Sequence, residues 1–244
     1  MAEILVRGQE TVVAQLMRAR YHEKVAAMRR HLESVGLDLS SFVVSMFPGN
    51  FEGTMVSKQA LIQGLLDDEL PLDHWAFLRS KLRNFAHLTD RRHPEEYALD
   101  LALGWISEEW LRHELDCQAG RPGAVVLIGV DAAREYSSLT IRATADFAIT
   151  KNDLTTRVDL MVDFHGTWAS SGYIDLKKGK VGHLVNATLD AVLGFDVQNS
   201  SFHVVQLAHL AGRQFASNAA MGGNQTMKVP VPISVDLKYL LQAL

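Results

Sequence analysis

The chain has 244 residues, of which 48% are hydrophobic and 21% charged, and its formal net charge is −4. This composition is typical of a globular protein and excludes a disordered chain, a collagen and a mucin-like stalk. The negative net charge excludes a surface that is basic all over, but it does not exclude a local basic face for nucleic acid.

No apolar run approaches the roughly 20 residues of a membrane helix, so no membrane partner is expected. The first residues lack the pattern of a signal peptide. The chain has one cysteine, Cys117, which cannot form an internal disulfide. These observations favour a reducing, cytoplasmic location.

Helical periodicity dominates the chain up to about residue 120. Apolar residues recur at spacings of three and four across 8–35, which predicts a long amphipathic helix ended by Gly36. Ser57 is a candidate N-cap and Pro94 suits a first helical position. Three further helices are therefore predicted, at 57–66, 73–87 and 94–117.

Alternating β-branched residues replace this pattern after residue 120. Strands are predicted at 124–130, 136–150, 155–164, 172–177, 202–207 and 229–235. A turn at 151–154 would join two of them as a hairpin, residues 181–193 favour a helix, and a short helix should end the chain. This order predicts an α/β or α+β core, with a mixed sheet flanked by helices.

Two short segments combine acids with strand-like surroundings. Asp175 and Lys177 should share one face of a strand, about 6.6 Å apart at the usual rise. Asp159 lies inside an apolar strand, and fifteen residues rich in turn formers separate it from Asp175. Antiparallel pairing would bring the two carboxylates together, where they would repel each other without a cation. Mg²⁺ suits such a pair, since it takes one or two carboxylates together with water and phosphate oxygens.

The pattern Asp159, fifteen residues, then Asp175-Leu176-Lys177 resembles the motif of the PD-(D/E)xK nuclease superfamily. The resemblance covers residues 96–180. Val158 stands where that motif has its proline, and the second acid is Asp instead of the commoner Glu. The resemblance implies a restriction-endonuclease-like core over 94–244, preceded by a helical region over 1–93 for recognition or dimerisation.

The superfamily often adds a glutamate from the helix before the sheet. Glu108 shares the apolar stripe of the predicted 94–117 helix, so it is the first candidate, with Glu109 second. Asp163 is an alternative to Asp159, although it borders the turn. Lys178 is an alternative to Lys177, although it should point the opposite way from Asp175.

The resemblance implies a role for each residue. Asp159, Asp175 and the Leu176 carbonyl would hold Mg²⁺, for which Mn²⁺ could substitute, and Glu108 would reach the metal. Lys177 would orient the attacking water and offset the developing negative charge. Weaker candidates for DNA contact are Lys178, Lys180, Trp168, Arg79, Lys81 and Arg83; the basic residues of 79–92 are otherwise explained as a solvated helix face.

These observations predict a Mg²⁺-dependent endonuclease acting on double-stranded DNA, and within that class a homodimeric type II restriction enzyme. The alternatives are a phage, repair or transposition nuclease of the same core, and a DNA-binding or interaction protein whose acidic pair is structural. The sequence has no Walker loop, GxGxxG, HExxH or G-x-S-x-G motif to support a different enzyme class.

Overall fold

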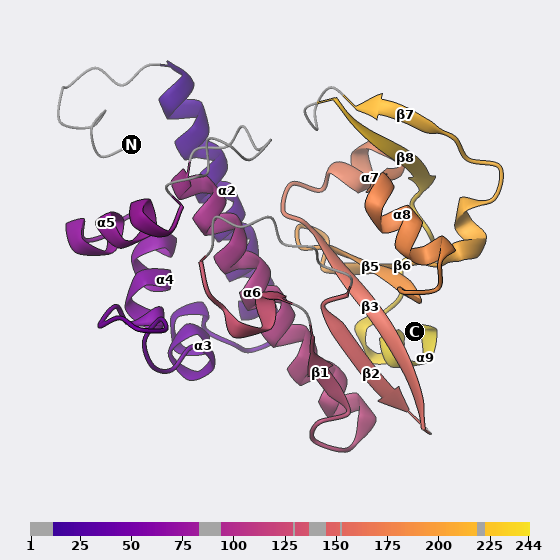
Figure 1. Cartoon of the computed structure of the whole chain (residues 1–244), viewed down its shortest axis with the longest axis horizontal. Helices are drawn as coiled ribbons and strands as arrows, with labels where there is room; N and C mark the ends of the chain where they lie inside the picture. Colours follow the sequence, from indigo (N-terminus) through magenta and orange to yellow (C-terminus); the bar gives the residue numbers. More distant parts are fainter. Residues whose placement is uncertain (1–11, 83–93, 129, 137–144, 152, 219–222) are drawn as a thin grey trace. The chain divides into compact units, whose positions relative to one another are not determined.

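The computed structural model describes residues 12–82, 94–128, 130–136, 145–151, 153–218 and 223–244. The chain forms two compact units, one made of residues 1–103 and 135–138 and the other of residues 104–134 and 139–244. The fold combines helices with a five-stranded and a three-stranded sheet, which confirms the predicted mixture of α and β structure (Figure 1). None of the helices described is both long enough and apolar enough to span a membrane.

The first unit is helical. Its helices are α2 (Val12–Ser34), α3 (Leu39–Met46), α4 (Lys58–Leu66), α5 (Leu72–Lys81) and the first part of α6 (Pro94–Ala119). Gly36 follows α2 with a φ of 81°, as a helix-ending glycine requires. The Ser57 side chain accepts a hydrogen bond from the Ala60 N–H, which confirms the predicted cap of α4.

The core of the first unit lies between α2 and its neighbours. Met28 and Leu32 of α2 are fully buried, as are Leu61 and Ile62 of α4. The largely buried Lys24 ammonium lies 2.6 Å from a carboxylate oxygen of Asp100, which satisfies a charge that would be costly to bury alone.

The second unit is built on a five-stranded mixed sheet. Its strands, in chain order, are β1 (Val125–Leu127), β2 (Phe147–Lys151), β3 (Leu154–Asp163), β5 (Ala191–Asp196) and β6 (Ser201–Val205). They are neighbours in that same order, and only β3 and β5 pair in parallel. The predicted hairpin at 151–154 is the connection between β2 and β3.

A smaller antiparallel sheet has the strand order β4-β8-β7. Its strands are β4 (Tyr173–Lys177), β7 (Phe215–Asn218) and β8 (Asn224–Pro230). The short helix α7 (Thr167–Ser171) precedes β4, and α8 (Lys178–Val185) follows it on the way to β5 (Figure 1). The parallel connection from β3 to β5 therefore contains two helices and a strand of the second sheet.

The remaining short helices of the described chain are η2 (Val130–Ala133), η3 (Leu207–Leu210), η5 (Leu237–Tyr239) and α9 (Leu240–Ala243). The last of these confirms the short helix predicted at the C-terminus.

Two apolar layers cover the five-stranded sheet. Trp110 of α6 stacks on Phe195 of β5, with ring centroids 5.3 Å apart, and on Phe202 of β6. A second cluster of buried side chains joins β5 to α8 and to the smaller sheet, through Val192, Leu184 and Ile174 among others. Burial on both faces explains why every residue of β5 is buried.

Several predicted boundaries were wrong. Residues 181–193 were expected to form one helix, but α8 ends at Val185 and β5 begins at Ala191. A strand was expected only from residue 229, yet β8 already begins at Asn224. The strand expected at 136–150 is described only from residue 147 as β2, because residues 137–144 lie outside the described part of the chain.

Candidate functional site

The predicted pairing of Asp159 with Asp175 is wrong. Asp159 lies on β3, which pairs with β2 and β5, whereas Asp175 lies on β4, which pairs with β8. Ile174 and Leu176 point into the core that the two sheets share, so the alternating side chain of Asp175 points away from that core. Asp175 Oδ1 instead accepts a hydrogen bond from the Thr226 hydroxyl, at 3.2 Å.

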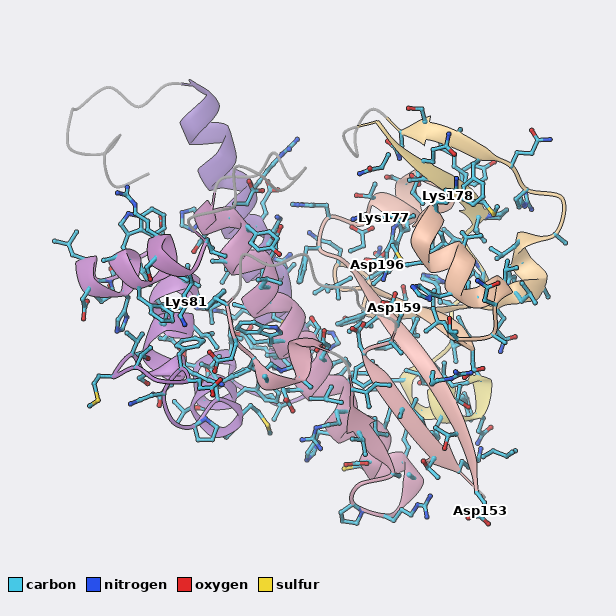
Figure 2. The ribbon with its side chains drawn as sticks, in the orientation of Figure 1. Lys81, Asp153, Asp159, Lys177, Lys178 and Asp196 are labelled. Atoms are coloured by element: carbon cyan, nitrogen blue, oxygen red, sulfur yellow. The ribbon has the colours of Figure 1, made fainter. Side chains whose placement is uncertain are left out.

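Leu176 and Lys177, like Asp175, do not lie beside Asp159, so they do not form the predicted metal site. Leu176 is fully buried and pairs with Met227, while Lys177 is exposed and pairs with Thr226. Figure 2 labels Lys177 and Lys178 where β4 passes into α8, and Asp159 on β3. The fifteen-residue spacing therefore reflects the connection through α7 and not a hairpin between the two acids.

The carboxylate beside Asp159 belongs to Asp146. Phe147 pairs with Val158 at the start of the β2–β3 ladder, which brings the preceding Asp146 next to Asp159. The Asp146 N–H donates to the Val158 carbonyl at 2.9 Å, and the Leu160 N–H donates to Asp146 Oδ2 at 2.6 Å. Two backbone hydrogen bonds thus fix one acid beside the other.

Lys180 supplies the cation of this cluster. Its ammonium, from the first turns of α8, forms a hydrogen-bonded ion pair with Asp159 Oδ2. The Asp159 side chain is only 4% exposed and that of Lys180 26%. The lysine offsets the cost of burying the Asp159 carboxylate. The sequence placed Lys180 only among weak DNA contacts.

Glu108 contributes to the same electrostatic environment from α6. Burial and the negative charges of Asp159 and Glu108 together raise the pKa of Asp146 to about 8, against the opposing effects of the Leu160 N–H and Lys180. Glu108 also forms an ion pair with the buried Arg134 guanidinium, which lies 3.4 Å from Glu109 Oε1 as well. Glu109 is further held by Arg112, so Glu108 is the helix acid that acts on Asp146.

The donor chemistry of this cluster suits a hard divalent cation. Asp146 and Asp159 offer carboxylate oxygens, and the raised pKa of Asp146 reflects crowding of negative charge that a cation would relieve. Within the described residues, no group of three or more His, Cys, Asp or Glu side chains is placed to hold a metal ion. An ion at this place would therefore have two carboxylates and would take its other oxygens from water or substrate, as Mg²⁺ commonly does.

The remaining predicted contacts fall elsewhere. Trp168 was a weak candidate for DNA contact but is buried in the core beneath β5, so that contact is wrong for this side chain. Arg79 and Lys81 lie on α5 in the first unit, next to the rings of Trp75 and Phe77, and Arg83 lies outside the described residues. Asp163, the alternative to Asp159, accepts hydrogen bonds from the N–H groups of His165 and Trp168 and so fixes the start of α7.

Sequence reasoning missed Asp146, although the sequence contained the signal for it. In a hairpin closed by the pair Lys151 and Leu154, residues equally far from that pair along the two strands lie opposite each other, and Asp146 and Asp159 are equally far from it. The hairpin was predicted, but its register was not followed to the acids. The Lys180 partnership had no comparable signal, because it depends on the return of α8 to the sheet.

Comparison with known proteins adds no relative to this description. No protein-family model matches the chain, and no match was found among curated proteins or solved structures.

Proposed function

We propose that this protein is a Mg²⁺-dependent nuclease that hydrolyses phosphodiester bonds of DNA. The observation that carries the proposal is the cluster of Asp146 and Asp159 on neighbouring strands, with the Lys180 ammonium on Asp159. Two carboxylates can hold the ion of metal-assisted phosphate hydrolysis, and a lysine beside them can offset the negative charge that develops on the phosphate. The proposal keeps the predicted class of enzyme but replaces Asp175 and Lys177 as its site residues.

The arrangement of elements supports the same class. A helix carrying a glutamate, α6 with Glu108, precedes a mixed sheet whose first three strands are antiparallel. A connection through α8 then leads to the parallel strand β5, and helices cover the sheet. A mixed sheet flanked by helices, with an acid on the preceding helix, is what the PD-(D/E)xK resemblance implies for the core.

The two aspartates would hold the metal, and the chain's other groups would complete the site. A bound Mg²⁺ would polarise the phosphate and lower the pKa of a bound water molecule. Lys180 keeps a positive charge at Asp159 and can face the negative charge that develops on a phosphate oxygen. Arg134 holds Glu108, which keeps this third carboxylate near Asp146 without leaving its charge uncompensated.

The proposal is tested by incubating the purified chain with supercoiled plasmid in Mg²⁺ and, separately, in EDTA. We expect nicked or linear DNA in Mg²⁺ and intact plasmid in EDTA. The Asp146→Asn variant should leave the plasmid intact in Mg²⁺ as well. Plasmid that stays intact with Mg²⁺ and with Mn²⁺ would contradict the proposal. It would favour the alternative of a DNA-binding or interaction protein in which the acidic residues are structural.

The biological role is tested by sequencing the DNA ends. A type II restriction enzyme, the finer role that we propose, gives ends at one recurrent sequence and acts as a homodimer on palindromic sites. Scattered ends would instead assign the activity to a phage, repair or transposition nuclease.

A further inference from the structure

The three-stranded sheet has one face in the core and one face that carries charged and aromatic residues. Four apolar side chains on one face are buried in the core: Ile174, Leu176, Met227 and Val229. Because side chains alternate along a strand, Tyr173 and Lys177 of β4 lie on the opposite face. Lys228 of β8 lies there too, since it pairs with Asp175 in the register of the two strands.

Among the residues that the structure describes, no carboxylate lies within ion-pair distance of Lys177 or Lys228 on this face. Asp175 pairs with Lys228 across the strands, yet its carboxylate accepts a hydrogen bond from Thr226 at 3.2 Å. Lys177 and Lys228 are diagonal neighbours, a relationship that places Cα atoms about 7–8 Å apart. The face therefore carries two lysines on neighbouring strands, with Asp175 on the same face.

An exposed aromatic ring accompanies these lysines. Tyr173 is 42% exposed, and the Lys228 ammonium lies 5.9 Å from its ring centroid. Phe215 of β7 pairs with Met227, so its ring and the Lys178 ammonium beside it lie on the other side of the sheet. Surfaces that bind single-stranded nucleic acid combine cations for the backbone with rings on which bases stack.

The charge of this part of the chain favours a polyanion. Residues 165–235 contain five lysines and arginines against three aspartates, although the whole chain carries −4. Lys180 among them is paired with Asp159, while Asp190 pairs with Arg157 and Asp196 is buried. An acidic peptide would match the charge alone, whereas a nucleic acid matches both the charge and the exposed ring of Tyr173.

We infer that the face formed by Tyr173, Lys177 and Lys228 binds a nucleic-acid strand that carries unpaired bases. The lysines contact phosphates and Tyr173 stacks on a base, which a fully paired duplex does not offer. The inference goes beyond the proposed function, because it assigns the binding of unpaired bases to a face of β4 and β8 that carries none of the proposed metal-site residues.

The test measures binding by the full chain in EDTA, so that no cleavage occurs. Fluorescence anisotropy compares labelled oligothymidylate with a duplex of equal length. We expect tighter binding of the oligothymidylate. The Lys177→Gln/Lys228→Gln double variant should lower the slope of log K against log salt by about 1.4, at about 0.7 per lost contact. Tyr173→Ala should weaken binding about fivefold or more.

A second tyrosine and lysine provide a matched control. Tyr239 is 52% exposed, with the Lys238 ammonium 4.8 Å from its ring centroid, but Asp236 forms an ion pair with that lysine at 3.4 Å. Tyr239→Ala and Lys238→Gln should therefore leave affinity and salt dependence unchanged.

The outcomes separate this inference from the proposed function. Preference for the duplex, or equal losses in the test and control variants, overturns the inference, whatever the plasmid assay shows. Binding that depends on Tyr173 and on Lys177 with Lys228 supports it, even when no metal-dependent cleavage is found and the proposed function fails.

Discussion

Asp146 is the residue whose protonation the fold controls most strongly. Burial and the charges of Asp159 and Glu108 raise its pKa from 3.8 to about 8. Between about pH 4 and 8, the folded state therefore keeps the proton of Asp146, whereas the unfolded state has released it. The contribution of this group to the free energy of unfolding is complete at low pH and is lost as the pH rises through about 8.

The Asp146→Asn variant should remove this pH dependence. Asparagine is neutral and can still accept the Leu160 N–H, so the metal-free variant should melt a few degrees above the wild type at about pH 9. One kcal/mol corresponds to about 2–4 °C in a chain of this size. Thermal unfolding of both proteins in EDTA from about pH 5 to 9 measures this difference. If the variant is no more stable than the wild type at about pH 9, Asp146 does not lie in the buried, negatively charged surroundings described above.

Arg134 is the counter-charge for the acids of α6. Its side chain is 6% exposed and contacts Glu108 and Glu109, whose side chains are each 12% exposed. Arg134→Ala should lower the free energy of unfolding by about 3 kcal/mol, because it leaves buried carboxylates without their partner.

Urea denaturation measures the effect of Arg134→Ala, and Arg157→Ala is its control. The side chains of Arg157 and Asp190 are 40% and 36% exposed, so loss of this pair should lower the free energy of unfolding much less than loss of the Arg134 pairs. Equal losses in the two variants would show that the Arg134 pairs are no stronger than a surface contact.

At the scale of elements, β5 depends on a close contact with Trp168. A Cβ at Gly194 would lie 2.9 Å from a ring atom of Trp168 and 3.4 Å from Ile174 Cδ1. Gly194→Ala should therefore destabilise the protein by about 1–3 kcal/mol through overpacking.

Urea denaturation measures this loss of stability, and Gly182→Ala in α8 is the control. A Cβ added at Gly182 would meet no atom within 4 Å. Gly182→Ala should keep or raise stability, because alanine favours a helix. A Gly194→Ala variant as stable as the wild type would show that the tryptophan does not pack against β5 as described.

The same elements show how far the sequence could lead. Alternation and turn residues predicted the β2–β3 hairpin, because both signals are local. β5 was missed, since a strand buried on both faces is a short apolar run that periodicity does not separate from a helix. The partner of β4 is β8, about fifty residues later in the chain, and no local pattern specifies such a pairing.

At the scale of the whole molecule, the candidate site belongs to one unit. Glu108, Asp146, Asp159 and Lys180 all lie in the unit of residues 104–134 and 139–244. The sequence predicted Asp159 and Glu108 from an apolar strand and an apolar helical stripe. It assigned the second acid and the lysine to β4, because spacing along the chain was taken as proximity in space.

The most direct test of this account is the rate of Mg²⁺-dependent plasmid cleavage by Asp159→Asn and by Asp163→Asn. The two acids lie on the same strand and are 3% and 6% exposed, but only Asp159 belongs to the proposed site. Loss of a residue that only supports a metal ligand costs about 10–100-fold, so Asp159→Asn should lose more than about 100-fold, while folded Asp163→Asn still cuts. Unchanged cleavage by Asp159→Asn, or its abolition only by Asp175→Asn, would contradict the account.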